Sequence, residues 1–324
     1  MEKTSQKKTP KISLIGAGNI GGTCAHLIAM RNLADVVLFD VVEGLPQGKA
    51  LDLATCSPME GWDVSIMGTN DYSDISDSDA IVVTAGITRP PAGTASLLNR
   101  EALLSHNAKV IREVAENIKK YSPNAFVIVV TNPLDAMTWL LREVSGLHRQ
   151  MVVGMAGGLD SSRFNYFLGK ELGIPSKQIQ STIIGAHGDT MVILPRFSYV
   201  NGISLDKFLD NRSDREEIIN RVTKRTKGAG GEVVTLLKTS AYRAPATAVL
   251  QLLLSYLNNT KTSILCSALL DGEYGVHDLC VGVPALIGSK GVEQIKQLDL
   301  QDKEKEDFQN SASYIQKLVD TLKV

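Results

Sequence analysis

The apolar residues in the first half of the chain fall into short continuous runs separated by amphipathic stretches. Residues 11–15, 36–39, 80–84 and 125–130 are such runs, typical of strands that are buried on both faces of a sheet. Amphipathic periodicity between the runs, clearest at about 101–121, favours helices. This repeated alternation predicts an α/β fold with a Rossmann-type, doubly wound parallel sheet.

The pattern changes after about residue 151 to a mixture of helices and short strands of antiparallel character. Helical patterns cover 159–172, 302–322 and most of 213–258, where Ser213 is a plausible N-cap and breaks are expected near 228–231 and 240–245. Strands are expected at 190–194, 197–200, 264–270 and 279–283. We therefore predict a tail over 1–10, a dinucleotide-binding domain over 11–153 and a C-terminal α+β substrate domain over 154–324.

Composition narrows the class of protein without identifying it. The 324 residues are 44% hydrophobic and 21% charged, with a net charge of −1, so no basic surface argues for nucleic acid. No apolar run reaches the roughly 18 residues of a membrane span, and the polar start does not resemble a signal peptide. The four cysteines are scattered without a CxxC pair, so we expect no metal site and a cytoplasmic location.

A glycine-rich turn follows the first predicted strand. Its sequence is Gly16-Ala17-Gly18-Asn19-Ile20-Gly21, and a stretch compatible with a helix follows it. The strand before and the helix after give this GxGxxG pattern the context of a dinucleotide site, where a pyrophosphate lies at the helix N-terminus. Asp40 ends the second predicted strand, where a carboxylate can accept hydrogen bonds from a ribose diol and repel a 2′-phosphate. NAD is therefore favoured over NADP, although Asp40 as a simple helix cap is the alternative.

Two further polar groups follow predicted strands. Thr84, Ala85 and Gly86 come after the third strand, and Asn132 after the fourth. Ligands bind at this carboxyl edge in doubly wound sheets. We expect Asn132 to serve both the nicotinamide ribose and the substrate, with a plain turn before Pro133 as the alternative.

Residues 86–100 are irregular and predict a long loop that closes over a ligand, referred to below as the lid. The lid contains two prolines, the cations Arg89 and Arg100, and the apolar pair Leu97 and Leu98. Long loops of this kind are often active-site lids, and exposed leucines are accounted for if the loop closes.

The candidate catalytic group is His187, which lies between two glycines after an apolar pair. An imidazole in such a place can donate and accept a proton near neutral pH, although a lone histidine is more often structural. Asp160 and Arg163, three residues apart on one predicted helix face, change that balance. The carboxylate can orient the imidazole, and the guanidinium can hold a carboxylate substrate through two parallel hydrogen bonds.

Taken together, these motifs resemble those of the NAD-dependent lactate/malate dehydrogenase family over residues 11–324. The matching segments are 16–21, Asp40, 83–86, 131–135, 159–163 and 185–189. The resemblance implies proton transfer by His187, orientation of the imidazole by Asp160, and binding of the substrate carboxylate by Arg163. It also implies polarisation of the carbonyl by Arg100 of the closed lid, and a homotetramer.

The resemblance leaves open which 2-hydroxy acid is the substrate. Arg89, early in the lid, resembles the arginine that faces the second carboxylate in malate enzymes. The lid is longer than the malate type, however, and resembles that of apicomplexan lactate dehydrogenases, with Leu98 where those enzymes place a tryptophan. Ala241, which faces the substrate in that comparison, is compatible with either acid. We expect L-lactate dehydrogenase activity; the alternatives are malate dehydrogenase, a dehydrogenase of bulkier 2-hydroxy acids, and a catalytically silent NAD-binding sensor.

Overall fold

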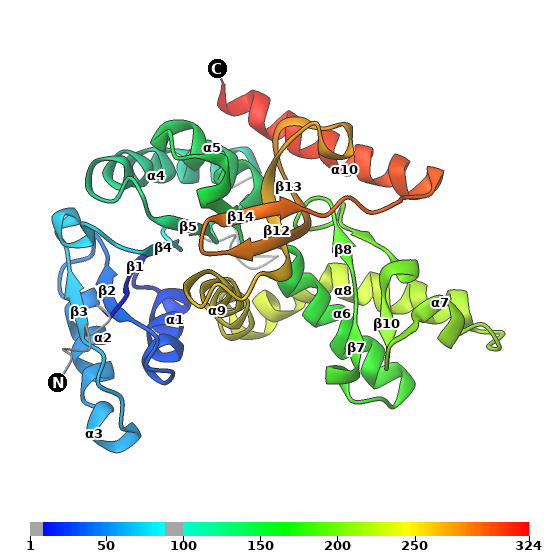
Figure 1. Cartoon of the computed structure of the whole chain (residues 1–324), viewed down its shortest axis with the longest axis horizontal. Coiled ribbons are helices and arrows are strands. Elements are labelled where there is room, and N and C mark those ends of the chain that lie inside the picture. The colour runs from blue at the N-terminus through cyan, green and yellow to red at the C-terminus, as the bar shows by residue number, and fades with distance from the viewer. Residues whose placement is uncertain (1–8, 88–99, 324) are drawn as a thin grey trace, which may run out of the picture.

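Six parallel strands form the first part of a large twisted sheet (Figure 1). The computed structural model describes residues 9–87 and 100–323. The strands are paired in the order β3-β2-β1-β4-β5-β6, which confirms the predicted Rossmann-type arrangement. Their bounds are β1 Lys11–Ile15, β2 Asp35–Phe39, β3 Ile66–Thr69, β4 Ala80–Val83, β5 Phe126–Val129 and β6 Val152–Gly154.

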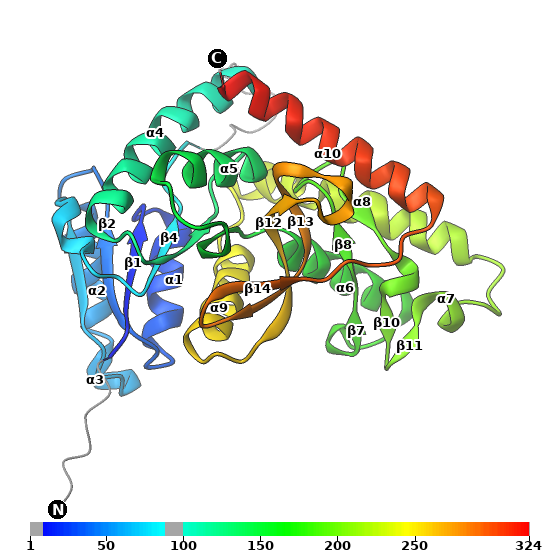
Figure 2. The same cartoon turned by 45° about the horizontal axis from the view of Figure 1, so that its top comes forward.

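Helices cover both faces of this sheet. Helices α4 and α5 pack together on one face and α1 packs with α9 on the other, which is the doubly wound arrangement (Figure 1). The helices of the first half are α1 Asn19–Ala29, α2 Leu45–Ala54, α3 Ser57–Glu60, α4 Arg100–Tyr121 and α5 Leu134–Ser145. The long terminal helix α10, Asp302–Leu322, lies across α5 and α4 (Figure 2).

The sheet does not end with the parallel strands. Strand β12, Thr262–Asp271, pairs antiparallel with β6 and is followed by β13, His277–Gly288, and β14, Gly291–Ile295. The result is one nine-stranded mixed sheet. The sequence predicted two of these three strands, and β14 was missed. One hydrophobic core therefore continues from the parallel strands into the second half of the chain.

The rest of the second half is built around α6 and α8. Phe164 and Leu168 of α6 pack with Ile218 and Val222 of α8 in a separate hydrophobic cluster. The remaining helices are α6 Gly157–Leu172, α7 Leu205–Phe208, α8 Arg215–Leu237 and α9 Arg243–Leu257. The short strands are β7 Ile179–Gln180, β8 Ile183–Ile184, β9 Val192–Ile193, β10 Tyr199–Val200 and β11 Ile203–Ser204. Single 3₁₀ turns are η1 Tyr72–Ile75, η2 Arg149–Met151, η3 Ser176–Gln178, η4 Pro195–Phe197 and η5 Glu273–Gly275.

The predicted break at residues 228–231 is wrong, because α8 runs through the glycines without interruption. A glycine costs roughly 1 kcal/mol relative to alanine inside a helix. The packing of α8 on α6 offsets that cost, since Val222, Thr226 and Ala229 are all buried on the inner side of α8. The N-cap position is Asp214, one residue after the predicted Ser213. The second predicted break is real but shorter, covering residues 238–242.

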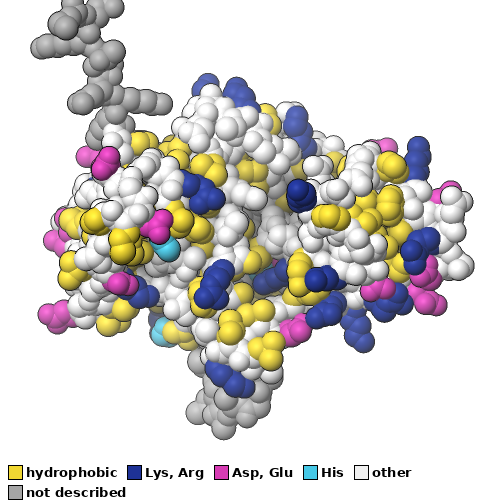
Figure 3. Space-filling model, turned by 90° about the horizontal axis from the view of Figure 1, so that it is seen from below, with side chains coloured by type: hydrophobic (Ala, Val, Ile, Leu, Met, Phe, Trp, Pro, Cys, Tyr) yellow, Lys and Arg dark blue, Asp and Glu magenta, His cyan; other side chains and the backbone are white. Residues whose placement is uncertain are grey.

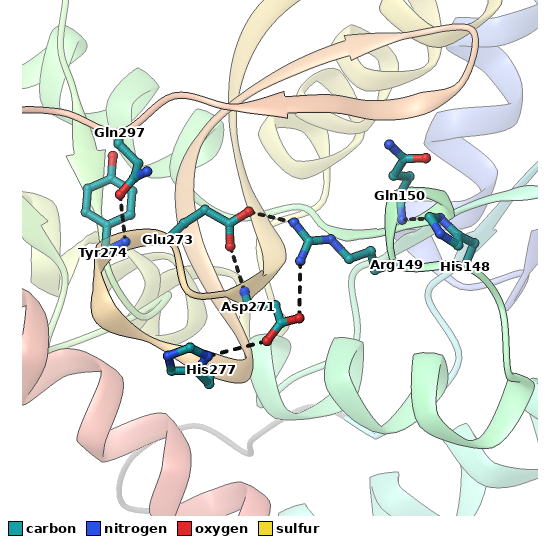
Figure 4. Close-up of polar contacts among 8 residues, drawn as sticks. All are labelled: His148, Arg149, Gln150, Asp271, Glu273, Tyr274, His277 and Gln297. Carbon is teal, nitrogen blue, oxygen red and sulfur yellow. Dashed lines mark hydrogen bonds and ion pairs between the residues drawn. The ribbon is translucent and has the colours of Figure 1, made fainter.

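An ion-pair cluster joins η2 to the turn between β12 and β13 (Figure 4). The Arg149 guanidinium donates to Glu273 at 2.6 Å and lies 4.0 Å from Asp271. Glu273 also accepts the backbone N–H of Asp271, and His277 lies 3.4 Å from the Asp271 carboxylate. This cluster fastens the antiparallel strands to the end of β6, where the two halves of the sheet meet.

Within residues 9–87 and 100–323, no helix is long and apolar enough to cross a membrane.

Candidate active site

Each of the three glycines of the GxGxxG turn is needed for a different structural reason. Gly16 has a φ of +110°, and a Cβ there would lie 2.6 Å from Thr84 Oγ1. A Cβ at Gly18 would project into open space at the start of α1. A Cβ at Gly21 would lie 1.9 Å from the carbonyl oxygen of Gly16, so the helix can approach the strand only without one. The turn, the open approach and the close packing are those that a dinucleotide site requires.

The N-terminus of α1 is suited to bind the pyrophosphate of a dinucleotide. Asp40 is suited to bind its ribose. Among the described residues, no side chain caps the N-cap position Gly18, so the partial positive charge of the helix end is available to an anion. Asp40, at the end of β2, accepts the backbone N–H of Ala17 at 2.7 Å and that of Val42 at 3.0 Å. These bonds fix the carboxylate beside the glycine turn, where it can accept ribose hydroxyls.

The carboxyl ends of β4 and β5 lie next to the same turn. Thr84 donates to the Gly16 carbonyl at 3.0 Å, and Thr131 donates to the Ala85 carbonyl at 2.6 Å. Asn132 follows with an exposed side chain that makes no hydrogen bond within the described part of the chain. Its amide is therefore available to a ligand, and its service to the nicotinamide ribose and the substrate stays a prediction.

Asn107 is a buried polar residue at the candidate site that the sequence analysis did not single out. It lies in α4, is fully buried, and its side chain exchanges hydrogen bonds with the backbone N–H and C=O of Ile87. It also donates to the carbonyl of Asn132 at 2.6 Å. A signal was present, because Asn107 shares the apolar face of its helix with Leu104 and Ile111. The residue joins the base of the lid to the Asn132 loop.

His187 and Asp160 form a buried pair. The imidazole Nδ1 lies 2.8 Å from Asp160 Oδ2, and the exposed fractions of the two side chains are 14% and 2%. Burial disfavours the protonated imidazole, but the charge and hydrogen bond of Asp160 outweigh burial and raise the pKa of His187. The carboxylate therefore favours a proton on the ring and fixes the ring orientation.

Arg163 shares the same carboxylate. Its Nη1 lies 3.4 Å from Asp160 Oδ1, one helical turn away on α6. Burial lowers the pKa of Arg163 and the charge of Asp160 opposes that effect. The guanidinium faces α8, where a Cβ at Gly230 would lie 3.8 Å from Nη2. Its other N–H groups have no partner among the described residues, which leaves them free for a carboxylate ligand.

The candidate catalytic loop, residues 185–190, is held beside the carboxyl edge of the sheet by Asp135. This residue is in the first turn of α5, three positions after Asn132, and its Oδ2 accepts the backbone N–H of His187 at 2.9 Å. The contact places His187 beside the carboxyl end of β5. Asp135 belongs to a matching segment of the sequence, but its contact with the histidine was not foreseen.

Four predicted residues are not joined to this cluster by the structure. Arg89 and Leu98 lie outside the described residues, and Arg100 begins α4 with a side chain outside the described part. Ala241 is half-buried in the connection between α8 and α9. Their contacts with a substrate stay predictions.

A hollow of about 750 Å³ lies between α6 and α8. Figure 3 shows Lys and Arg side chains gathered among acidic and hydrophobic ones on the right-hand side, over the region of α6, α7 and α8. In this hollow Arg221 pairs with Glu171, and Arg225 pairs with Glu232 and stacks on Phe167. Four basic and two acidic side chains line the hollow, and no histidine is among them, so the candidate proton-transfer chemistry is assigned to the His187 cluster.

A dinucleotide site beside a histidine–carboxylate pair is typical of a nicotinamide-dependent oxidoreductase. The family model for the NAD-binding domain of lactate/malate dehydrogenases matches residues 10–154, and the model for the α/β C-terminal domain matches residues 158–323. The chain belongs to the lactate/malate dehydrogenase family. It is an NAD-dependent oxidoreductase that acts on CH–OH groups.

Solved structures similar to this chain carry both activities. Cryptosporidium parvum malate dehydrogenase is 43% identical, with a TM-score of 0.93 over 97% of this chain and 99% of that chain. The lactate dehydrogenase of the same organism, complexed with lactic acid and NAD, is 42% identical, with a TM-score of 0.93 over 98% and 99%. Eimeria maxima lactate dehydrogenase, with NADH and oxamate, is 40% identical, with a TM-score of 0.91 over 98% and 96%. The comparisons therefore establish the family and leave the substrate open.

Proposed function

We propose that this chain is an L-lactate dehydrogenase that interconverts (S)-lactate and pyruvate. The observation that carries the proposal is the Asp160 carboxylate, which holds both the His187 imidazole and the Arg163 guanidinium beside the carboxyl edge of the sheet. One carboxylate thus fixes both a proton donor and a cation that can bind a carboxylate. This pair fits a small 2-oxo acid, because the donor can reach the carbonyl oxygen while the cation binds the carboxylate.

Each residue of the cluster has a proposed task. His187 gives a proton to the carbonyl oxygen during reduction and takes it back during oxidation. Asp160 holds the ring through Nδ1, so the other ring nitrogen faces the substrate. Arg163 binds the substrate carboxylate through its free N–H groups. Arg100, whose side chain lies outside the described part, would stabilise negative charge on the substrate oxygen once the lid excludes water.

The cofactor residues are proposed from the fit of the glycine turn. Residues 16–21 would hold the pyrophosphate at the start of α1, Asp40 the adenosine ribose, and Asn132 the nicotinamide ribose. Residues 84–86 line the same edge. NAD, when bound, supplies the nicotinamide that donates or accepts hydride.

The preference for lactate rests on the lid. Its length resembles that of apicomplexan lactate dehydrogenases, and Leu98 would give the pocket an apolar wall. An apolar wall favours the pyruvate methyl, because a second carboxylate would be buried without a partner, at a cost of several kcal/mol. The small side chain of Ala241 is compatible with this pocket.

Malate dehydrogenase is the second candidate, because Arg89 could pair with a second carboxylate. The similarity to the Cryptosporidium parvum malate enzyme also favours it. The test compares kcat/KM for NADH oxidation with pyruvate and with oxaloacetate, in the wild type and in Arg89→Ala. A pyruvate preference that survives the substitution supports lactate. An oxaloacetate preference that collapses in Arg89→Ala supports malate.

We also propose a homotetramer in the cytoplasm, with domains over 11–153 and 154–324. The family resemblance supports the tetramer, and the matched ranges of the two family models support the domain boundary. All four cysteines are free thiols, which suits a reducing compartment. Sedimentation velocity tests the assembly, with an expected mass of four times the 35.0 kDa chain.

A further inference from the structure

Three consecutive backbone amides of the catalytic loop are held by three different elements. The N–H of Gly185 donates to the carbonyl of Gly282 in β13 at 2.8 Å. The N–H of Ala186 donates to the Ser311 hydroxyl of α10 at 2.8 Å. The N–H of His187 donates to Asp135 Oδ2 at 2.9 Å. The loop is thus fixed on three sides, and only the acceptor at His187 is ionisable.

Asp135 is an unusual choice for this anchor. It is 5% exposed, its Oδ2 accepts the His187 amide, and its Oδ1 accepts the Ser267 hydroxyl of β12 at 2.6 Å. A buried carboxylate is costly even when it is hydrogen-bonded. Ser311 anchors the neighbouring amide with a neutral hydroxyl. Anchoring the backbone therefore does not by itself require a charge at this position.

We propose that Asp135 is a positioning residue for the imidazole of His187, acting as a second buried carboxylate opposite Asp160. Asp160 holds the ring at Nδ1, while Asp135 holds the backbone amide of the same residue, so His187 is fixed both at its ring and at its backbone. The negative charge of Asp135 adds to that of Asp160 in favouring the protonated ring. The proposal rests on the proposed role of His187 in proton transfer.

The charged groups around His187 determine the direction in which its pKa should change when Asp135 is replaced. Asp160 and Arg163 face the residue from α6, and Asp135 faces it from α5. Burial lowers the pKa of His187, Asp160 raises it, Arg163 lowers it and Asp135 raises it. Burial also raises the pKa of Asp135, which the Ser267 hydroxyl and the His187 amide oppose. Removal of the Asp135 charge is therefore expected to lower the pKa of His187.

The first experiment measures that pKa by NMR titration of the imidazole in the wild type and in Asp135→Asn. The chain has five histidines, and His187→Asn identifies the signal. Asparagine keeps an oxygen for the His187 amide and an NH₂ group for Ser267, so the geometry is retained while the charge is lost. The expected result is a His187 pKa lower by about half a unit or more.

The second experiment separates positioning from general support of the fold. Asp135→Ala removes both the charge and the acceptor, and we expect kcat to fall by about 10- to 100-fold. We expect KM for the 2-oxo acid and the Kd for NADH to change by less than about threefold, because Asp135 is buried and its two oxygens contact Ser267 and the His187 amide. Asp135→Asn should recover most of the lost kcat while its pH profile stays displaced.

Ser311→Ala is the matched control, because it removes the anchor of the adjacent amide without changing any charge. The His187 pKa should be unaltered in this variant. An equal pKa shift in Ser311→Ala, or an unshifted pKa in Asp135→Asn, would overturn the proposal. If the Asp135 variants do not fold, Ser267→Ala takes their place. It removes the hydrogen bond that favours the ionised Asp135, so the His187 pKa should fall slightly, and an unchanged value overturns the proposal.

The proposed function and the proposed role of Asp135 can be refuted independently of each other. A wild-type protein that oxidises NADH with neither pyruvate nor oxaloacetate refutes the proposed function. The NMR titration still reports the effect of Asp135 on His187 in that case.

Discussion

Asp160 holds an imidazole and a guanidinium with one carboxylate, since each oxygen faces a different partner. His187 lies 2.8 Å from Oδ2 and Arg163 lies 3.4 Å from Oδ1. In the proposed mechanism this arrangement couples proton transfer to substrate binding, because any displacement of Asp160 would disturb both groups. The charge and hydrogen bond of Asp160 are also the largest of the effects that raise the pKa of the ring against burial.

Asp160→Asn is expected to move the pH dependence of the enzyme. Reduction requires the protonated ring, so kcat/KM with the 2-oxo acid should fall as pH rises through the raised pKa of His187, and oxidation should show the opposite limb. Without the charge of Asp160, burial dominates and both limbs should move to lower pH. The loss of kcat should be about 100-fold or more. Stopped-flow pH profiles in both directions provide the measurement, and limbs that do not move would contradict the assigned cause.

Asp40→Ala is expected to weaken NADH binding by roughly tenfold, about what the loss of one charge-assisted hydrogen bond costs. The same change should reduce the difference between the Kd values for NADH and NADPH, because the carboxylate that repels the 2′-phosphate is lost. Fluorescence titration with both cofactors gives the two Kd values. Asp40→Asn is the control, since it retains an acceptor for the Ala17 amide while removing the charge. Unchanged Kd values in both variants would remove Asp40 from the ribose site.

At the level of elements, α1 and its glycine turn offer a matched pair of substitutions. A Cβ at Gly21 would lie 1.9 Å from the Gly16 carbonyl, whereas a Cβ at Gly22 would meet only the Lys49 side chain at 3.6 Å. Gly21→Ala should therefore displace α1 and weaken both the fold and NADH binding. Gly22→Ala should be stable and bind NADH as the wild type does. Thermal unfolding and fluorescence titration test the pair, and equal behaviour would show that α1 adjusts without loss.

The glycines of α8 offer a second matched pair. Gly230→Ala would place a methyl group beside the Arg163 guanidinium, while Gly231→Ala would place one in open space. Both changes should stabilise the helix, by up to about 1 kcal/mol each. Only Gly230→Ala should raise KM for the 2-oxo acid, by a few-fold, because it restricts the guanidinium. Melting temperatures and KM values measure the two effects, and an equal KM in both variants would mean that Arg163 is not limited by α8.

Sequence patterns predicted the elements best where one signal dominates. Strands β1, β2, β4 and β5 and helix α10 follow directly from apolar runs and periodicity, whereas the short strands β3 and β6 were not predicted. The continuity of α8 did not, because local glycine propensity pointed to a break and tertiary packing on α6 outweighed it. β14 was missed because its few residues carry too little periodicity.

The candidate site divides in a similar way. The grouping of His187, Asp160 and Arg163 was predictable because residue type and spacing point to it, and their roles stay predictions. The contact of Asp135 with His187 joins residues 52 positions apart, so only the folded chain shows it. Asn107 lies between these cases, since a buried polar residue on an apolar helix face is a detectable signal.

At the scale of the whole molecule, the two matched family domains share one sheet and one core. β12 pairs with β6, and Ser267 of β12 donates to Asp135 of α5 across the boundary. The Arg149 cluster fastens the same junction. Such continuity predicts that the cofactor half and the substrate half do not unfold independently, although the sequence pattern suggested two domains.

Equilibrium unfolding tests this coupling with probes that report on different regions. Both tryptophans, Trp62 and Trp139, lie in the first half, so their fluorescence reports on that half, whereas far-ultraviolet circular dichroism reports on all helices. If the halves are coupled, the two denaturant transitions coincide. NADH at 100 times its Kd should then move both together, by about 2.7 kcal/mol. The opposite outcome is a dichroism transition with two phases, of which only the phase that coincides with the fluorescence change responds to NADH. That result would show that the shared sheet does not join the halves into one cooperative unit.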